Sequence, residues 1–142
     1  MESKYSIPLS EIINEFQLEV VHMPKDPKDI KVTSPEVARP GLALAGFTDV
    51  FEPFRIQILG RAEHAFLNSF SDEEHNARIL ELFKHNPVAV VVTSALPICD
   101  ETLKSAQDVG IPLLRTEERT SAFMAAIISS LNTSLEPRTT RH

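Results

Sequence analysis

The stretch Arg39-Pro-Gly-Leu-Ala-Leu-Ala-Gly-Phe47, followed by Arg55-Ile-Gln-Ile-Leu-Gly60, decides how this chain folds. Pro40 suits the first turn of a helix, because its fixed φ is helical and its missing N–H would have no partner there. Gly46 can end that helix in a left-handed conformation. The alternation of the second segment predicts a strand. A short buried helix that leads into a strand, with an arginine before each, is therefore the centre of the predicted fold.

Length and composition describe a globular protein of one domain. The 142 residues carry a net charge of −6, with 42% hydrophobic and 24% charged residues, which is ordinary for a folded domain. Because Lys and Arg are scattered and phosphate binding needs a concentrated basic patch, we expect no nucleic-acid partner. No signal peptide is visible at the N-terminus, and the longest apolar run, residues 88–92, is too short to cross a bilayer. We expect a cytoplasmic protein without a membrane partner.

The segment before Arg39 predicts one helix and one hairpin. Apolar residues recur at helical spacing over residues 9–16, so we expect an amphipathic helix there. Residues 17–22 and 30–32 alternate as strands, and the proline-rich segment 23–29 between them predicts an exposed loop. We therefore expect the two strands to pair with each other.

Two helices are expected after Gly60. The first would lie against the sheet through its apolar residues, Ala62, Ala65, Phe66 and Phe70. Ser71 and Glu74 form a capping-box pattern that begins the second helix. The inward side of this second helix is expected to carry Ala77, Leu80 and Phe83.

The last third of the chain predicts a parallel crossover. Residues 88–93 form a continuous apolar run rich in β-branched residues, typical of a strand covered on both faces. Asp100 can cap a helix that Gly110 closes, and residues 111–115 predict a second strand. Strand, helix and strand in this order are the outline of a βαβ unit.

A last helix is expected from Thr120 or Ser121, with a buried face of Phe123, Ile127, Ile128, Leu131 and Leu135. The predicted fold class is thus α/β, a single compact domain over residues 1–136 with a mixed or partly parallel sheet flanked by helices. Residues 137–142 are polar and predict a tail or linker.

Motifs of catalysis and metal binding are absent from the sequence. No segment has the spacing of a P-loop, of a dinucleotide-binding glycine motif or of a nucleophile elbow. The five histidines show no spacing that predicts a metal site. Cys99 precedes a predicted helix start, which can activate a thiol, but we interpret it as a small half-buried residue because no histidine is near it in sequence. We therefore expect no catalytic residue, metal or cofactor in this chain.

Arg39 and Arg55, together with Gly41, are the candidate functional residues. Arg39 precedes a predicted helix start whose free N–H groups, including that of Gly41, attract anions. One hypothesis is therefore a site for a small anion or a phosphorylated ligand. The alternative is that the arginines form ion pairs with Asp49 or Glu52 and hold the loop between helix and strand.

Three phenylalanines, Phe47, Phe51 and Phe54, lie close together in the segment after Gly46. We expect at least two of them to fold back onto the core, because large exposed apolar patches are rare in monomers. The alternative is that they form a contact with a second domain or subunit.

Several motifs, taken in chain order, carry a family resemblance. They are Arg39–Phe47, Arg55–Gly60, Val90–Thr93, Ile111–Thr116 and Pro137–Thr140 before His142. Together they resemble the N-terminal domain of bacterial HPr kinase/phosphorylase, over nearly the whole chain. The sequence departs from the family in Met23–Asp29, where a glycine-bearing turn is frequent, and at Ala38, where a small polar residue is frequent. The resemblance implies an α/β domain of the type also found at the N-terminus of a muramyl-peptide ligase, where it holds a UDP-sugar precursor.

The resemblance also implies a parent enzyme of the sugar phosphotransferase system. Such an enzyme phosphorylates a serine of the phosphocarrier HPr with ATP or pyrophosphate and magnesium, removes the phosphate by phosphorolysis, and works as a hexamer in the regulation of carbon metabolism. In the family a second domain with a P-loop follows. Because this chain ends at His142, we expect the phosphate-binding glycines, the catalytic aspartate and the magnesium ligands to lie outside it.

Two functions follow from the resemblance. The first is an accessory or regulatory domain of HPr kinase/phosphorylase, not catalytic alone, with the kinase domain of the same parent and HPr as partners. The alternative is a stand-alone domain that senses a small anionic or phosphorylated metabolite, such as a nucleotide sugar.

Overall fold

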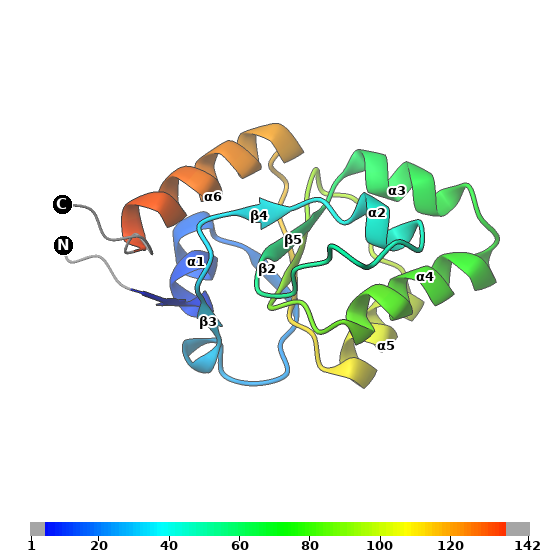
Figure 1. Cartoon of the computed structure of the whole chain (residues 1–142), viewed down its shortest axis with the longest axis horizontal. Helices are drawn as coiled ribbons and strands as arrows, with labels where there is room; N and C mark the ends of the chain where they lie inside the picture. Colours follow the sequence, from blue (N-terminus) through cyan, green and yellow to red (C-terminus); the bar gives the residue numbers. More distant parts are fainter. Residues whose placement is uncertain (1–4, 136–142) are drawn as a thin grey trace.

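A computed structural model describes residues 5–135, and its centre is a five-stranded mixed sheet between two groups of helices (Figure 1). The strand order is β2-β7-β6-β5-β4. Four neighbouring strands are parallel and β2 is antiparallel to β7. The strands are β2 (Glu19–His22), β4 (Val37–Ala38), β5 (Ile56–Leu59), β6 (Val90–Val92) and β7 (Leu113–Arg115). The α/β prediction is confirmed, whereas the expectations for residues 136–142 lie outside the described residues.

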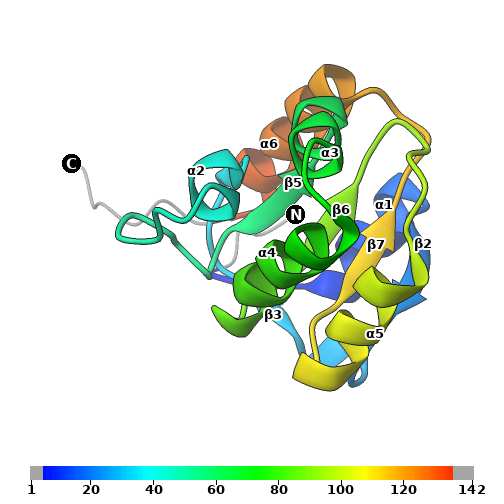
Figure 2. The ribbon, with the colours of Figure 1, turned by 90° about the vertical axis from the view of Figure 1, so that its right-hand side faces the viewer.

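Helices cover both faces of the sheet, as the view turned by 90° also shows (Figure 2). One face carries α2 (Gly41–Leu44), α3 (Arg61–Asn68), α4 (Asp72–Lys84) and α5 (Asp100–Val109). The other face carries α1 (Leu9–Phe16), α6 (Thr120–Ser134) and a small antiparallel pair, β1 (Ile7–Pro8) with β3 (Lys31–Val32). A short 3-10 turn, η1 (Pro27–Asp29), precedes β3.

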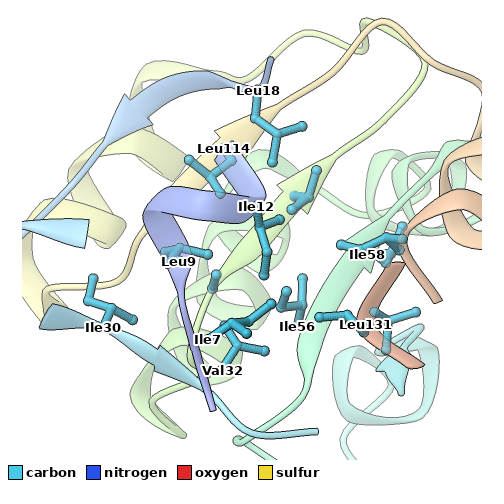
Figure 3. Close-up of a cluster of buried hydrophobic side chains, with 14 of the residues drawn as sticks. Ile7, Leu9, Ile12, Leu18, Ile30, Val32, Ile56, Ile58, Leu114 and Leu131 are labelled. Atoms are coloured by element: carbon cyan, nitrogen blue, oxygen red, sulfur yellow. The ribbon is translucent and has the colours of Figure 1, made fainter. Parts of the chain in front are cut away.

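Each face of the sheet has its own hydrophobic core. The first core joins α1, α6, β1 and β3 to one face, and ten of its residues are labelled in Figure 3. The second core joins α2, α3, α4 and α5 to the opposite face. In β5, Ile56 and Ile58 belong to the first core and Leu59 belongs to the second. A strand therefore supplies both cores by alternating its side chains.

The alternation of β5 does not mark a solvent-facing side, because all four of its residues are buried. Gln57, the polar position, is 0% exposed. Its side-chain N–H group donates to the backbone carbonyls of Glu52 at 3.2 Å and Arg55 at 3.0 Å. These bonds satisfy the amide N–H group at a core position, whereas the side-chain oxygen of Gln57 is buried without a partner within residues 5–135.

The predicted crossover over residues 88–115 is confirmed. Strands β6 and β7 are parallel neighbours joined by α5, and the three valines of β6 are buried. Gly110 ends α5 with a φ of 88°, a conformation that favours glycine. The N-cap of this helix is Cys99 and not Asp100, so the predicted boundary was one residue late.

The predicted hairpin of residues 17–22 with residues 30–32 is wrong. Strand β2 pairs with β7, and β3 pairs with β1. The cause is burial: Ile30 and Val32 are 7% and 0% exposed in the first core, and the carbonyl of Ile30 accepts from the Leu9 N–H at 2.8 Å. Because β3 packs under α1, it pairs with β1 and not with β2.

The predicted inward faces of α3 and α4 are partly wrong. In α3 the buried residues are Glu63 and Leu67, whereas Ala62 and Ala65 are exposed and Phe66 is half-buried. In α4, Phe83 is buried as expected, together with Ile79 and Leu82, while Leu80 is half-buried and Ala77 is exposed. Larger aliphatic side chains gain more from burial than alanines do. The start of α4 is as expected, with the Ser71 hydroxyl accepting from the Glu74 N–H at 3.2 Å.

The expectation for the three phenylalanines is also wrong. Phe47 and Phe54 are 48% and 49% exposed, and only Phe51 is half-buried, with its ring 5.6 Å from that of His85. Their segment lies beside β4, the edge strand of the sheet, so few elements are close enough to cover it.

None of the helices within residues 5–135 combines the length and apolar character needed to span a bilayer.

Candidate functional site

An ion pair between Arg39 and Glu63 lies where β4 and β5 end. The Arg39 guanidinium donates through Nε at 2.9 Å and through Nη2 at 2.7 Å to the two carboxylate oxygens of Glu63. The Gly60 N–H donates to the same carboxylate at 2.9 Å. Glu63 is only 6% exposed, so three charge-assisted bonds satisfy a buried anion.

A pair of threonines extends this cluster to β6 and α6. The hydroxyls of Thr93 and Thr120 are 2.6 Å apart, and the Thr93 N–H donates to the Leu59 carbonyl at 3.0 Å. Gly60 lies against Thr120 and Arg39. The cluster therefore joins the carboxyl ends of three parallel strands to the starts of α3 and α6.

Gly60 is required here for space and not for its backbone conformation, since its φ of −107° is open to any residue. A Cβ at position 60 would overlap the Thr120 hydroxyl and lie 3.1 Å from Arg39 Nη2. Gly60→Ala should therefore destabilise the domain by about 2 kcal/mol through overpacking, measured by urea denaturation. Removing the obstructing side chain with Thr120→Ala should make Gly60→Ala nearly neutral in that background; equal costs in both backgrounds would contradict the steric cause.

The structure gives both candidate arginines carboxylate partners. Arg39 pairs with Glu63, while Arg55 pairs with Glu36 at 2.6 Å and with Glu52 at 2.7 Å. Of the expected ion pairs, only that between Arg55 and Glu52 is present, and Arg39 pairs with Glu63 of α3 and not with Asp49 or Glu52. Gly41 begins the four-residue helix α2 and is exposed. The hypothesis of an anion site at these residues stays a prediction, whose test is given in the Discussion.

Sequence reasoning missed Glu63, which is the residue that holds Arg39 in place. A signal was available, because Glu63 stands three residues after Gly60, the spacing at which a glutamate bonds the N–H of the residue before a helix. Because the alanines of α3 are expected to face the sheet, the sequence pattern does not predict that Glu63 is buried. A buried glutamate needs a partner, and 24 residues separate Glu63 from the arginine that provides it.

A cleft opens at the carboxyl ends of β5 and β6. It has a volume of about 290 Å³ and lies between α3, α4 and the start of α5. Cys99 lines it and is exposed, so the expectation of a half-buried thiol is wrong. His64 and His75 line the same cleft, although neither is near Cys99 in sequence. Within residues 5–135, no group of three or more His, Cys, Asp or Glu side chains is placed to hold a metal ion.

Comparison with solved structures supports the fold. The chain is similar to the crystal structure of the CBS and DRTGG domains of the regulatory region of Clostridium perfringens pyrophosphatase, in complex with the activator diadenosine tetraphosphate. The TM-score is 0.61 and the identity 16%, over 93% of this chain and 51% of that one. At this identity the likeness concerns the fold alone.

A family model and curated relatives match this chain, and the relatives are more similar to it in sequence than that structure is. The family model described as HPr serine kinase N terminus matches residues 7–131. HPr kinase/phosphorylase of Lachnoclostridium phytofermentans is 32% identical over 97% of this chain, and that of Clostridium perfringens is 33% identical over 96%. The chain spans 45% and 44% of the length of these two relatives. This chain belongs to the family of HPr serine kinase N-terminal domains.

Proposed function

We propose that this chain acts as the N-terminal accessory domain of an HPr kinase/phosphorylase. The complete protein would phosphorylate a serine of HPr and remove that phosphate, and its kinase domain would supply the binding sites for ATP or pyrophosphate and for magnesium. The observation that carries the proposal is the family match over residues 7–131, which includes the Arg39–Glu63 cluster and, except for Leu135, the buried residues of both hydrophobic cores. The proposed partners are that kinase domain and HPr, in a hexameric assembly.

The positions of the family motifs support an accessory role. Arg39 and Gly60 hold strand ends and helix starts together, and Gln57 is bonded inside the sheet. These residues are engaged in the domain's own structure, as expected for a rigid module that positions or regulates a neighbouring domain.

A domain exchange tests the proposal. In the Clostridium perfringens enzyme, this chain would replace the matched N-terminal segment, to which it is 33% identical. We expect the chimera to phosphorylate HPr and to keep the assembly state of the parent enzyme. An unrelated α/β domain of the same length is the control, and we expect it to disturb assembly or regulation. A folded chimera no better than this control would contradict the proposal.

The chain by itself provides a second arm of the test. Incubated with HPr, magnesium and either ATP or pyrophosphate, the purified chain should form no phosphoserine on HPr detectable by mass spectrometry. Phosphoserine that persists through repeated purification of the chain would overturn the accessory role.

A further inference from the structure

The cleft at the carboxyl ends of β5 and β6 occupies the place where open parallel sheets bind ligands. Its floor includes Leu59 and Gly60 at the end of β5 and Val92 at the end of β6. Ligands of α/β sheets bind outside the carboxyl ends of the strands. The helices α3, α4 and α5 that surround the cleft are seen in Figure 2. At about 290 Å³, it suits a small ligand.

The loop on one side of the cleft is held in shape by Arg115. Ser94 and Ala95 have φ values of 60° and 53°, which are costly for residues with a Cβ. The Arg115 guanidinium donates to the carbonyls of Ala95 at 2.7 Å and Leu96 at 2.8 Å. Because Leu96 lines the cleft, these bonds preform its wall before any ligand binds.

The inner wall of the cleft is aliphatic. It is made of buried side chains from both strands, two helices and the loop before α5, namely Leu59, Leu67, Ile79, Val92 and Leu96. A sugar placed against this wall would lose water from its hydroxyls without gaining hydrogen bonds, and that loss is unfavourable. The wall therefore selects a ligand with an apolar body.

The rest of the lining adds hydrogen-bonding groups. They are His64, Asn68, His75, Cys99 and Thr102. Two pairs are already in contact, with Asn68 Nδ2 at 3.0 Å from His64 Nε2 and Cys99 Sγ at 3.2 Å from Thr102 Oγ1. These groups would go unused with a plain hydrocarbon. A heterocycle with apolar faces and a polar edge fits both the wall and the polar lining.

The charged residues around the cleft disfavour a phosphorylated ligand. Within the described part of the chain, no lysine or arginine lines the cleft. An adjoining hollow of about 220 Å³ shares Asn68, His75 and Cys99 with it and adds the carboxylates of Asp72 and Glu101. These acidic residues lie in the first turns of α4 and α5, so they already offset the positive helix ends that would otherwise attract a phosphate.

We propose that this cleft binds an uncharged nucleoside, with the base against the aliphatic wall and its polar edge toward His64, Asn68 and His75. The site lies between residues 59 and 102 and uses neither Arg39 nor Arg55. It stands independently of the accessory role, because a chain that fails the domain exchange can still bind a nucleoside.

Calorimetric titration with adenosine, guanosine, uridine and cytidine tests the proposal. We expect at least one of them to bind, and its 5′-monophosphate to bind about tenfold more weakly, because the phosphate meets Asp72 or Glu101. Cys99 is the sole cysteine of the chain and reports the location: the bound nucleoside should slow its alkylation by iodoacetamide. Absence of binding by all four nucleosides, unchanged alkylation, or tighter binding of the monophosphate would each overturn the proposal.

A matched pair of variants separates the cleft from the rest of the surface. Asn68→Trp places a large ring at the cleft, and Asn132→Trp places the same ring on α6. Both asparagines are exposed helical residues that bond a group four residues earlier, His64 and the Ile128 carbonyl respectively. Circular dichroism should show both variants folded. We expect only Asn68→Trp to weaken nucleoside binding, by tenfold or more; equal affinities in the two variants would overturn the assignment of the site.

Discussion

Arg39→Ala is expected to destabilise the domain by about 3 kcal/mol, because it leaves a buried carboxylate without its cation. Glu63 is 6% exposed and would keep only the Gly60 N–H. Arg39→Lys should recover part of the loss, since an ammonium cannot match the two-bond geometry of the guanidinium. Urea denaturation of the wild-type chain and both variants measures the difference in free energy of unfolding.

Removing the charge of Glu63 should destabilise the domain less than removing the side chain of Arg39. Glu63→Gln leaves Arg39, whose side chain is 36% exposed and can be hydrated, so it should cost less than Arg39→Ala. Lys104→Ala is the matched control, because Lys104 and Asp108 form an exposed pair at 3.2 Å that should contribute less than about 0.5 kcal/mol. An Arg39→Ala variant as stable as Lys104→Ala would contradict a structural role for the buried pair.

The same Arg39→Ala protein tests the anion hypothesis of the sequence. A site formed by Arg39, Gly41 and Arg55 predicts that inorganic phosphate binds the wild-type chain in a calorimetric titration and that folded Arg39→Ala loses this binding. Phosphate binding that Arg39→Ala leaves unchanged would exclude the site, and Arg39 would then have a structural role only.

Phe123→Ala should destabilise the domain by about 4 kcal/mol, by leaving a cavity in the first core. Phe123 is 1% exposed, and its ring lies 5.6 Å from that of Phe16 in an edge-to-face arrangement. The pair joins α6 to α1, two helices from opposite ends of the described chain. The midpoint of urea unfolding should therefore fall sharply.

Two further variants make this prediction specific. Phe123→Leu keeps most of the apolar volume and should cost about 1.5 kcal/mol or less. Thr133→Ala changes an exposed residue of the same helix and should change stability by less than about 0.5 kcal/mol. If Phe123→Ala resembled Thr133→Ala instead, α6 would not be packed on the sheet as described.

Local sequence patterns were sufficient where one segment contains all the information. The β-branched run of β6, the length of α5 and Gly110 at its end together predict a parallel crossover, because each part obeys a short-range rule. The same holds for the helix after Pro8 and for the cap at Ser71. The family motifs also identify the domain, as the match over residues 7–131 shows.

Strand partners and helix faces needed the tertiary structure. Residues 17–22 and 30–32 are both strand-like, but their sequences do not say that β2 pairs with β7 and β3 with β1. That choice depends on the apolar area that each pairing buries under α1. The inward face of α3 likewise depends on a charge, because Glu63 turns toward Arg39 and brings Leu67 inward with it.

The candidate sites, like the fold, were determined partly by local sequence and partly by the tertiary structure. The sequence by itself determined the α/β class, the parallel crossover and the family, and it drew attention to Arg39 and Arg55. Only the tertiary structure decided that Arg39 is held by Glu63 and that His64, His75 and Cys99 line one cleft. The physical reason is that helix and strand periodicities act over a few residues, whereas these side chains meet only after the parallel strands bring their carboxyl ends to one edge of the sheet.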